Sequence, residues 1–268
     1  MKDINKVKYN KYKFREKINK AKEEKVQITE AEYKKINNSY ELFFEENYEN
    51  NTYDHHIWIE VPKGPSWWNS TMGTHPQVYQ GGSTKFLRLK AIKKDDEYVT
   101  AGIKTPIAYG DGKFECEARF NGGAGSWPAI WMTHPNGAQN NYASYYEVDI
   151  SEYYETRDTT DTTYHCPQSM RGGEKYVEPV HTSIIKIEWN KFEWSWDEDS
   201  ITICINGVQI MNIANDGNPD HYPINAEDRT FIIILSMQYA SNPYLSDPDD
   251  SDLPLYMDIR NVKYYKKI

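Results

Sequence analysis

Three acidic residues, Glu147, Asp149 and Glu152, lie within six residues of one another in the segment 145–152, Tyr-Tyr-Glu-Val-Asp-Ile-Ser-Glu. The segment otherwise has the pattern of a β-strand, in which acidic residues are poor formers. Carboxylates this close also repel one another. The acids alone would fit a solvent-facing edge strand, whereas a group of carboxylates on one side of a strand could perform acid–base or nucleophilic chemistry.

The spacing of the acids decides which of them share a face. Glu147 and Asp149 share one because strand side chains repeat every two residues, but Glu152 would face the other way. A β-bulge at about 150–151 would rotate Glu152 back and leave about 13 Å between the two glutamate Cα atoms. Their carboxyls could then approach to roughly 5–5.5 Å, the separation of a nucleophile and acid/base pair in retaining glycosidases. Asp149 between them would keep one Glu protonated near neutral pH.

The elements that must position these acids are strands. From about residue 55 the chain alternates apolar and polar residues, as in the segments 85–90, 113–120, 183–189 and 200–205, whereas 231–235 is a continuous apolar run. Dipeptides that contain glycine, such as Asp111-Gly112, Gly122-Gly123 and Asn206-Gly207, favour turns between these segments. Many short strands separated by turns predict an all-β antiparallel sandwich.

A second motif, Gly-Ser-Trp-Pro-Ala-Ile-Trp-Met at 125–132, lies upstream of the acids. Together, Gly-x-Trp-Pro-Ala-x-Trp and Glu-x-Asp-x-x-Glu resemble glycoside hydrolase family 16, which includes laminarinases, lichenases, agarases, carrageenases and porphyranases. Segments 112–115, 193–207 and 255–265 resemble other strands of that family, so that the resemblance covers about 55–268. It implies a β-jelly-roll of two curved antiparallel sheets, concanavalin A-like, with an open cleft, and a retaining endo-glycanase that hydrolyses internal β-glycosidic linkages.

The resemblance also implies residue roles. Glu147 corresponds to the nucleophile, Glu152 to the general acid/base, and Asp149 to the residue that orients and tunes the nucleophile. The spacing matches the bulged form of the motif and not the Glu-x-Asp-x-Glu of lichenases, which makes a mixed-linkage glucanase less expected. Ser-Met-Gln-Tyr at 236–239 replaces a Gly-Gly segment of laminarinases, which leaves galactans or host-type glycans open beside β-glucans.

Five further residues are candidates for substrate binding. Trp127 and Trp131 are four residues apart and so share one face of a strand. One or both would stack against a sugar in a binding subsite, although Trp131 fits a core position equally well. His165 would hydrogen-bond a sugar or serve the structure. Arg171 would meet a sulfate or carboxylate, or be a solvated loop residue. Trp67 lies in a Pro/Gly-rich loop, where an exposed aromatic pair suggests a cleft rim.

Residues 1–50 differ from the rest, being rich in Lys, Glu and Asn and free of Gly and Pro. A capping box, Thr-Glu-Ala-Glu at 29–32, predicts a helix at about 30–46. We therefore expect a charged extension at 1–50 and a jelly-roll domain at 51–268. The extension is either a solvated leader with a docking helix or an attachment arm for a larger assembly.

Charge and composition exclude several classes of function. The net charge is −9. Residues 1–25 hold ten Lys/Arg and four Asp/Glu, a net charge of +6, whereas residues 26–268 hold 21 Lys/Arg and 36 Asp/Glu, a net charge of −15. An acidic body argues against nucleic-acid binding. No apolar run long enough to span a membrane occurs. Three scattered cysteines are too few for a disulfide framework or a zinc site.

Several expectations on cofactors, location and activity complete the prediction. No cofactor is required and no metal site is expected, although the resemblance allows a structural calcium that the sequence does not locate. Extracellular action is expected, but the first residues lack an apolar signal core. Removal of a signal peptide, or release of a bacteriophage particle enzyme by lysis, would explain extracellular action without an apolar signal core. The alternatives to hydrolysis are a non-catalytic glycan-binding module on the same fold and a transglycosylase.

Overall fold

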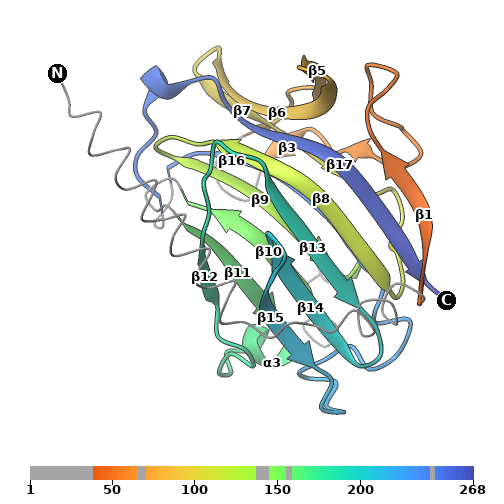
Figure 1. Cartoon of the computed structure of the whole chain (residues 1–268). Coiled ribbons are helices and arrows are strands. Elements are labelled where there is room, and N and C mark those ends of the chain that lie inside the picture. The colour runs from red at the N-terminus through yellow and green to blue at the C-terminus, as the bar shows by residue number, and fades with distance from the viewer. Residues whose placement is uncertain (1–38, 66–70, 137–144, 155–158, 242–244) are drawn as a thin grey trace, which may run out of the picture. The chain divides into compact units, whose positions relative to one another are not determined.

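The computed structural model describes residues 39–65, 71–136, 145–154, 159–241 and 245–268. The chain divides into two compact units, 1–39 and 40–268. The described part of the second unit consists almost entirely of β-strands (Figure 1). Its strand pairs are antiparallel, apart from the short parallel pair of β4 (Thr71–Met72) with β7.

The first sheet is built around two long strands near its centre. Its order follows from the pairing of neighbouring strands. It consists of β5 (Gln77–Gly81), β6 (Thr84–Lys94), β17 (Leu255–Lys267), β8 (Gly112–Asn121), β13 (Asn190–Trp196), β14 (Ser200–Ile205) and β15 (Val208–Ala214). At its far end β17 pairs with β1 (Tyr40–Glu46) in place of β6.

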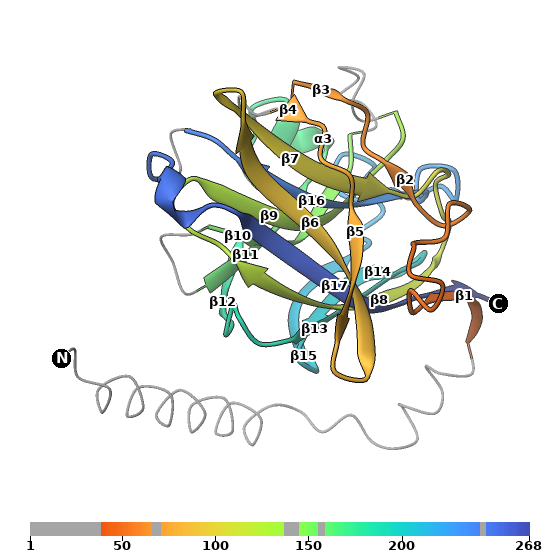
Figure 2. The same ribbon diagram turned by 90° about the horizontal axis from the view of Figure 1, so that it is seen from above.

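The second sheet lies over the first as a separate layer (Figure 2). Its strand order again follows from pairing. It consists of β2 (Ile59–Glu60), β7 (Glu97–Lys104), β16 (Ile232–Tyr239), β9 (Ser126–Thr133), β10 (Glu147–Tyr153), β11 (Thr159–His165) and β12 (Val180–Ser183). Smaller elements complete the unit: β3 (Gly64–Pro65), a one-turn helix α3 (Pro167–Met170) and a 3₁₀ turn η3 (Asp250–Asp252).

The hydrophobic core lies between the two sheets. Alternate residues of each strand enter it, as the period-two patterns predict. Phe114 of β8 and Trp194 of β13 stack with ring centroids 4.6 Å apart, and both are fully buried. Val148 and Ile150 of β10 contribute to the core from the second sheet and are also fully buried. Because successive side chains of a strand point to opposite faces, the residues that alternate with Val148 and Ile150 face away from the core.

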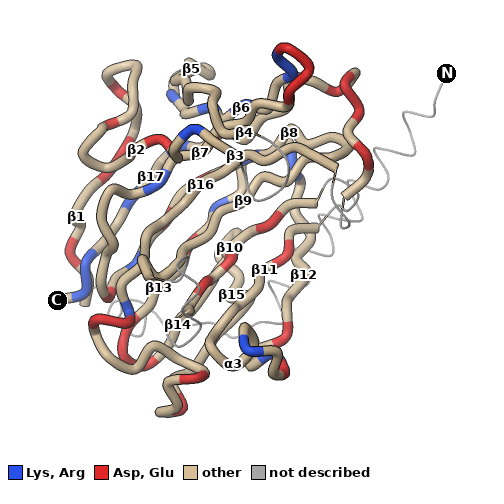
Figure 3. The backbone as a smooth tube through the Cα atoms, turned by 180° about the vertical axis from the view of Figure 1, so that it is seen from behind, with Lys and Arg blue, Asp and Glu red and all other residues tan. Residues whose placement is uncertain are grey.

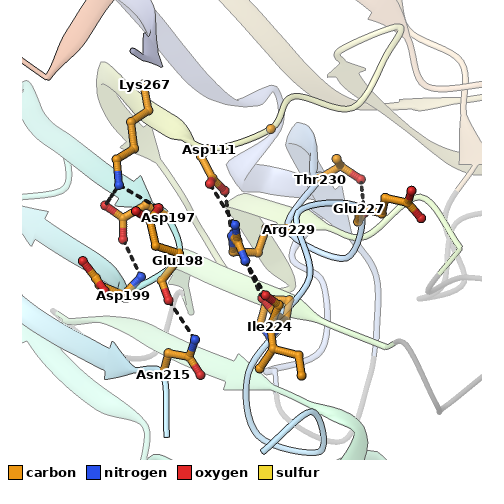
Figure 4. Close-up of polar contacts among 12 residues, drawn as sticks. Asp111, Asp197, Glu198, Asp199, Asn215, Ile224, Glu227, Arg229, Thr230 and Lys267 are labelled. Atoms are coloured by element: carbon orange, nitrogen blue, oxygen red, sulfur yellow. Dashed lines mark hydrogen bonds and ion pairs between the residues drawn. The ribbon is translucent and has the colours of Figure 1, made fainter. Parts of the chain in front are cut away.

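Ion pairs fix the loops at one edge of the sandwich (Figure 4). The buried Arg229 guanidinium donates to both carboxylate oxygens of Asp111, at 2.8 and 3.0 Å, and to the carbonyl of Ile224 at 2.6 Å. Lys267 pairs with Asp197 at 3.0 Å and with Glu198 at 2.7 Å. A bidentate arginine–carboxylate contact fixes the relative orientation of its two side chains. The contact between Arg229 and Asp111 therefore holds the loop before β16 against the start of β8.

The predicted helix at about 30–46 is wrong over 40–46, because those residues form strand β1. The spacing of Tyr40 and the Phe43-Phe44 pair suits one face of a helix, but aromatic residues also favour strands. Phe44 contacts the rings of Phe114 and Tyr264 at 6.2 and 5.8 Å, and the backbone of β1 pairs with β17. These distant contacts favour the extended form. Residues 30–38 lie outside the described part of the chain.

Two expectations drawn from composition can be compared with the structure. Cys116, Cys166 and Cys204 are all free thiols. Within the described residues, no helix has the length and apolar character needed to cross a membrane.

Candidate active site

The predicted β-bulge is present in β10 and sets the geometry of the acids. Three residue steps along β10, from Asp149 to Glu152, match two steps along the neighbouring strand β11, from Thr163 to Asp161. The same shift occurs against β9, where Trp131 lies opposite Asp149 and Ala129 opposite Glu152. The bulge therefore absorbs one residue and returns Glu152 to the side of the sheet that carries Glu147 and Asp149.

The side of the second sheet that faces away from the core carries these acids, and we call it the carboxylate face. Residues directly opposite each other on paired strands share a face, so the register defines its members. Figure 3 shows the acidic positions of β10 in the middle of the sheet. The carboxylate face includes Ile232, Ile234, Ser236 and Gln238 of β16, Trp127, Ala129, Trp131 and Thr133 of β9, Glu147, Asp149 and Glu152 of β10, Thr159, Asp161, Thr163 and His165 of β11, and His181 and Ser183 of β12.

Neutral donors and one imidazole surround the three carboxyl groups. The Tyr145 hydroxyl donates to Glu147 Oε2 at 3.0 Å, and the Tyr154 hydroxyl donates to Glu152 Oε1 at 3.1 Å. His165 lies opposite Glu147 in the register, and its Nε2 is 3.2 Å from Asp149 Oδ2. Among the described residues, no Lys or Arg forms an ion pair with any of the three acids.

Burial and mutual repulsion raise the pKa values of all three acids. Burial, followed by the like charge of Asp149, raises the pKa of Glu147 from 4.5 to about 8. The same two causes raise the pKa of Glu152, and burial raises that of Asp149. The hydrogen bonds from Tyr145 and Tyr154 lower the pKa values of their partners and offset part of this. At neutral pH the cluster therefore retains protons, as a site that needs one ionised and one protonated carboxyl requires.

The two tryptophans of the 125–132 motif both lie on the carboxylate face, but in different surroundings. Trp131 is partly exposed, lies directly opposite Asp149, and donates from Nε1 to Ser236 Oγ at 3.3 Å. Trp127 is 8% exposed, and its ring lies 5.2 Å from that of Tyr154. The position of Trp131 suits an exposed platform beside the acids, whereas Trp127 packs against a residue that contacts one of them.

Other predicted site residues lie farther along the chain. His165 joins the cluster, as described. Arg171, the residue after α3, is exposed, forms an ion pair with Asp220 and donates from Nε to the carbonyl of Pro167 at 3.1 Å. Its contact with substrate stays a prediction. Trp67 lies outside the described residues.

Sequence reasoning missed the tyrosines beside the acids. Tyr145 and Tyr154 lie two residues outside Glu147 and Glu152, so strand parity would have placed them on the same face. It also missed a pair on the neighbouring strands, in which His181 Nδ1 lies 2.6 Å from Asp161 Oδ1. The register of β12 against β11 creates this pair, and no local pattern indicates that register.

The cluster also has donors that metals use. Ligand atoms of Glu147, Asp149 and His165 all lie within 4.8 Å of one another. Calcium takes oxygen ligands and not imidazole, so this set does not suit the structural calcium that the resemblance allows. Hydroxyl donors and raised carboxyl pKa values make the arrangement capable of acid–base chemistry.

Comparisons with known proteins identify the family. The model for glycosyl hydrolases family 16 matches residues 65–243. A keratan-sulfate endo-1,4-β-galactosidase from Sphingobacterium multivorum is 26% identical over 237 residues, which cover 85% of this chain and 55% of that protein. A β-glucanase from Rhodothermus marinus is 33% identical over 158 residues, 53% of this chain and 52% of that protein. The chain thus spans about half the length of these relatives.

Solved structures confirm the fold. A laminarinase from Flavobacterium sp. UMI-01 superposes with a TM-score of 0.71 at 20% identity, covering 84% of this chain and all of that one. A non-specific endo-β-1,3(4)-glucanase of family 16 superposes with a TM-score of 0.72 at 21% identity, covering 86% of this chain and 92% of that one. The predicted jelly-roll is therefore correct, and this chain belongs to glycosyl hydrolase family 16.

Proposed function

We propose that this chain is an endo-acting, retaining glycoside hydrolase whose catalytic residues are Glu147 and Glu152. The observation that carries the proposal is the β10 bulge, which brings both glutamates to one face of the sheet with Asp149 between them. A purely structural strand gains nothing from three clustered carboxyls that, among the described residues, have no Lys or Arg partner. A double displacement needs such a group, since one carboxyl must attack while another donates a proton.

The two steps assign one task to each acid. Glu152 has a raised pKa and holds the proton that passes to the glycosidic oxygen as the bond to the leaving sugar breaks. Glu147, once ionised, attacks the anomeric carbon and forms a glycosyl-enzyme. Glu152, now ionised, removes a proton from the incoming water, which cleaves the glycosyl-enzyme and releases Glu147. The configuration of the anomeric carbon is inverted twice and therefore retained.

Asp149 and His165 support the ionised nucleophile in this scheme. The carboxyl of Asp149 lies 3.2 Å from His165 Nε2, beside Glu147. When Glu147 becomes charged, a proton on Asp149, whose pKa is raised by burial, reduces the repulsion that otherwise raises the pKa of the nucleophile. Trp131, opposite Asp149 on β9, would offer its ring to the apolar face of the sugar being cleaved.

For the substrate we propose a glycan with internal β-galactosyl linkages, of the galactan or host-glycan type. The relative that aligns with 85% of this chain is named a keratan-sulfate endo-1,4-β-galactosidase. Relatives named as glucanases align with 53–59%. The segment 236–239, which lacks the Gly-Gly of laminarinases, points the same way because Ser236 and Gln238 lie on the carboxylate face.

Product analysis with a polysaccharide panel tests the proposal. The panel contains keratan sulfate, mucin glycans, agarose, porphyran, carrageenans, laminarin and lichenan, and mass spectrometry measures the oligosaccharides released. Glu147→Gln serves as the inactive control, and ¹H NMR of fresh products gives the anomeric configuration. We expect oligosaccharides from a galactose-containing glycan, first in the β-configuration, and none from the variant.

Three results would contradict parts of the proposal. Products from laminarin or lichenan alone would refute the galactoside assignment and keep the reaction. Products that first appear as the α-anomer would refute the retaining mechanism. Glycan binding without products from any member of the panel would support a binding module on the same fold instead.

A further inference from the structure

The strand that carries the acids has a tyrosine pair at each end. Tyr145-Tyr146 precede Glu147, and Tyr153-Tyr154 follow Glu152. The inner-facing member of each pair is buried, Tyr146 at 2% and Tyr153 at 0% exposure. The other member is partly exposed and donates to the nearer glutamate, at 3.0 Å from Tyr145 and 3.1 Å from Tyr154.

Each of these hydrogen bonds occupies one of the two oxygens of its carboxyl. Tyr145 binds Oε2 of Glu147, which leaves Oε1 without this donor, and Tyr154 binds Oε1 of Glu152, which leaves Oε2 without it. A carboxyl oxygen that accepts a hydrogen bond is a poor place for a proton and a weaker nucleophile, because its lone pair is engaged. Each tyrosine therefore makes the two oxygens of its glutamate unequal.

We infer that Tyr145 and Tyr154 are positioning residues that select the reactive oxygen of each catalytic glutamate. This inference rests on the proposed function. Tyr154 directs the acidic proton of Glu152 to Oε2, which is the oxygen that then protonates the leaving group. Tyr145 directs the attack of Glu147 to Oε1.

Packing fixes the Tyr154 hydroxyl in place. Its ring lies 5.2 Å from the Trp127 ring, which is itself 8% exposed. Burial, and then the charge of Glu152, raise the pKa of Tyr154, so that the hydroxyl stays protonated and acts as a donor. Trp127 thus acts on the acid through Tyr154, which gives the first tryptophan of the motif a role other than a sugar platform.

The charged and titratable groups around both glutamates come from β10, β11 and β12. Glu147 and Glu152 face Asp149 on their own strand and the β11 residues His165 and Asp161, the latter paired with His181 of β12. Strand β9 adds no titratable group there, because Thr133 lies opposite Glu147, Trp131 opposite Asp149 and Ala129 opposite Glu152. None of these neighbours is altered when a tyrosine hydroxyl is removed, so each Tyr→Phe change removes the hydrogen bond to one glutamate and keeps the charged groups around it.

Carboxyl titration of the full chain tests the inference without any substrate. Glutamate labelled with ¹³C at the side-chain carboxyl reports each pKa by NMR, and Glu147→Gln and Glu152→Gln assign the two signals. Because each hydrogen bond favours the ionised form, we expect Tyr154→Phe to raise the pKa of Glu152 by about one pH unit and to leave Glu147 nearly unchanged. Tyr145→Phe should do the reverse.

Tyr265→Phe is the matched control. Tyr265 is a partly exposed residue of the first sheet that also donates to a glutamate, Glu115, at 3.0 Å, and its removal should move neither active-site signal. Equal shifts of both signals in one variant, or no shift in either, would overturn the inference. With the galactose-containing glycan of the panel that the wild type cleaves as the probe, Tyr154→Phe should also lower kcat about tenfold. No cleavage of any such glycan by the wild type would refute the proposed substrate class, while the titration would still decide this inference.

Discussion

The acidic side chains on the outer faces of the two sheets have different hydrogen-bond and ion-pair partners. On the outer face of the first sheet, Asp258 is fully buried and receives hydrogen bonds from Arg88 at 2.6 and 2.8 Å and from Arg119 at 2.9 Å. Glu117 pairs there with Arg260 at 2.7 Å. On the carboxylate face, the acids of β10 have hydroxyl donors and one histidine as neighbours.

The difference appears in the proton affinities. Burial alone would raise the pKa of Glu115 on the first sheet, but Lys113 and Lys191 more than offset this, and its pKa lies below its ordinary value. At Glu147, His165 and the hydrogen bond from Tyr145 offset the effect of burial only in part, and the pKa rises to about 8. A guanidinium or ammonium fixes a carboxylate as an anion, whereas a hydroxyl leaves it able to bind and release a proton. The first arrangement stabilises the fold, and the second permits proton transfer.

The largest expected effect is the loss of turnover on the carboxylate face. Glu147→Gln and Glu152→Gln should each reduce kcat by about 10³-fold or more, because one removes the nucleophile and the other the proton donor. A reducing-sugar assay on the cleaved polysaccharide measures this. Glu115→Gln, the matched change on the first sheet, should retain near-native activity. If either active-site variant kept near-native turnover, the roles assigned to these glutamates would be wrong.

A second prediction concerns the acids that have arginine partners. Arg88→Ala leaves the buried Asp258 with only Arg119 of its two cations. We expect a loss of about 3 kcal/mol in the free energy of unfolding, because a buried charge becomes only partly compensated. Urea denaturation measures it. Lys93→Ala, which breaks the exposed pair with Asp250, should cause no measurable loss. Equal losses in both variants would contradict the importance of burial.

Much of the architecture follows from local sequence. Period-two alternation and glycine turns predicted the strands, and the three-residue step from Asp149 to Glu152 predicted the bulge, because only an extra residue returns the second glutamate to the same face. The strand at 40–46 was missed since its pairing partner lies more than 200 residues away in sequence, at 262–267. Long-range pairing overrides local helix signals.

The site itself was predictable in part. The acids and His165 followed from spacing and resemblance, but the contact between Trp127 and Tyr154 depends on side-chain packing across two strands. The direction of each tyrosine hydroxyl likewise depends on where β10 begins and ends, which is the least certain feature of any strand prediction. Residue types therefore indicated the chemistry of the site, whereas the strand register determined which side chains contact the glutamates and shift their pKa values.

The comparison between the sheets also predicts a pH dependence of stability. Glu147 has a higher pKa in the folded chain than its ordinary 4.5, so folding favours its protonated form. The stability it contributes is complete below about pH 4.5 and is lost as the pH rises towards 8. Glu147→Gln lacks this loss, so its free energy of unfolding should exceed that of the wild type by a few kcal/mol at pH 8 and by much less at pH 5. Urea denaturation at the two pH values measures the difference, and a constant difference would contradict it.

The smallest effect is the same substitution on the first sheet, with the opposite sign. The pKa of Glu115 is lowered, so its contribution to stability is present above its unfolded pKa and is lost as the pH falls through the folded one. Glu115→Gln should therefore be less stable than the wild type by about 1 kcal/mol at pH 7, and the deficit should shrink towards pH 3. The unfolding series used for Glu147→Gln measures this, extended to acid pH. Both variants replace a glutamate by glutamine, and the neighbouring charges distinguish them, since lysines lie beside Glu115 and Asp149 lies beside Glu147. pH slopes of the same sign would show that burial alone decides how these acids titrate.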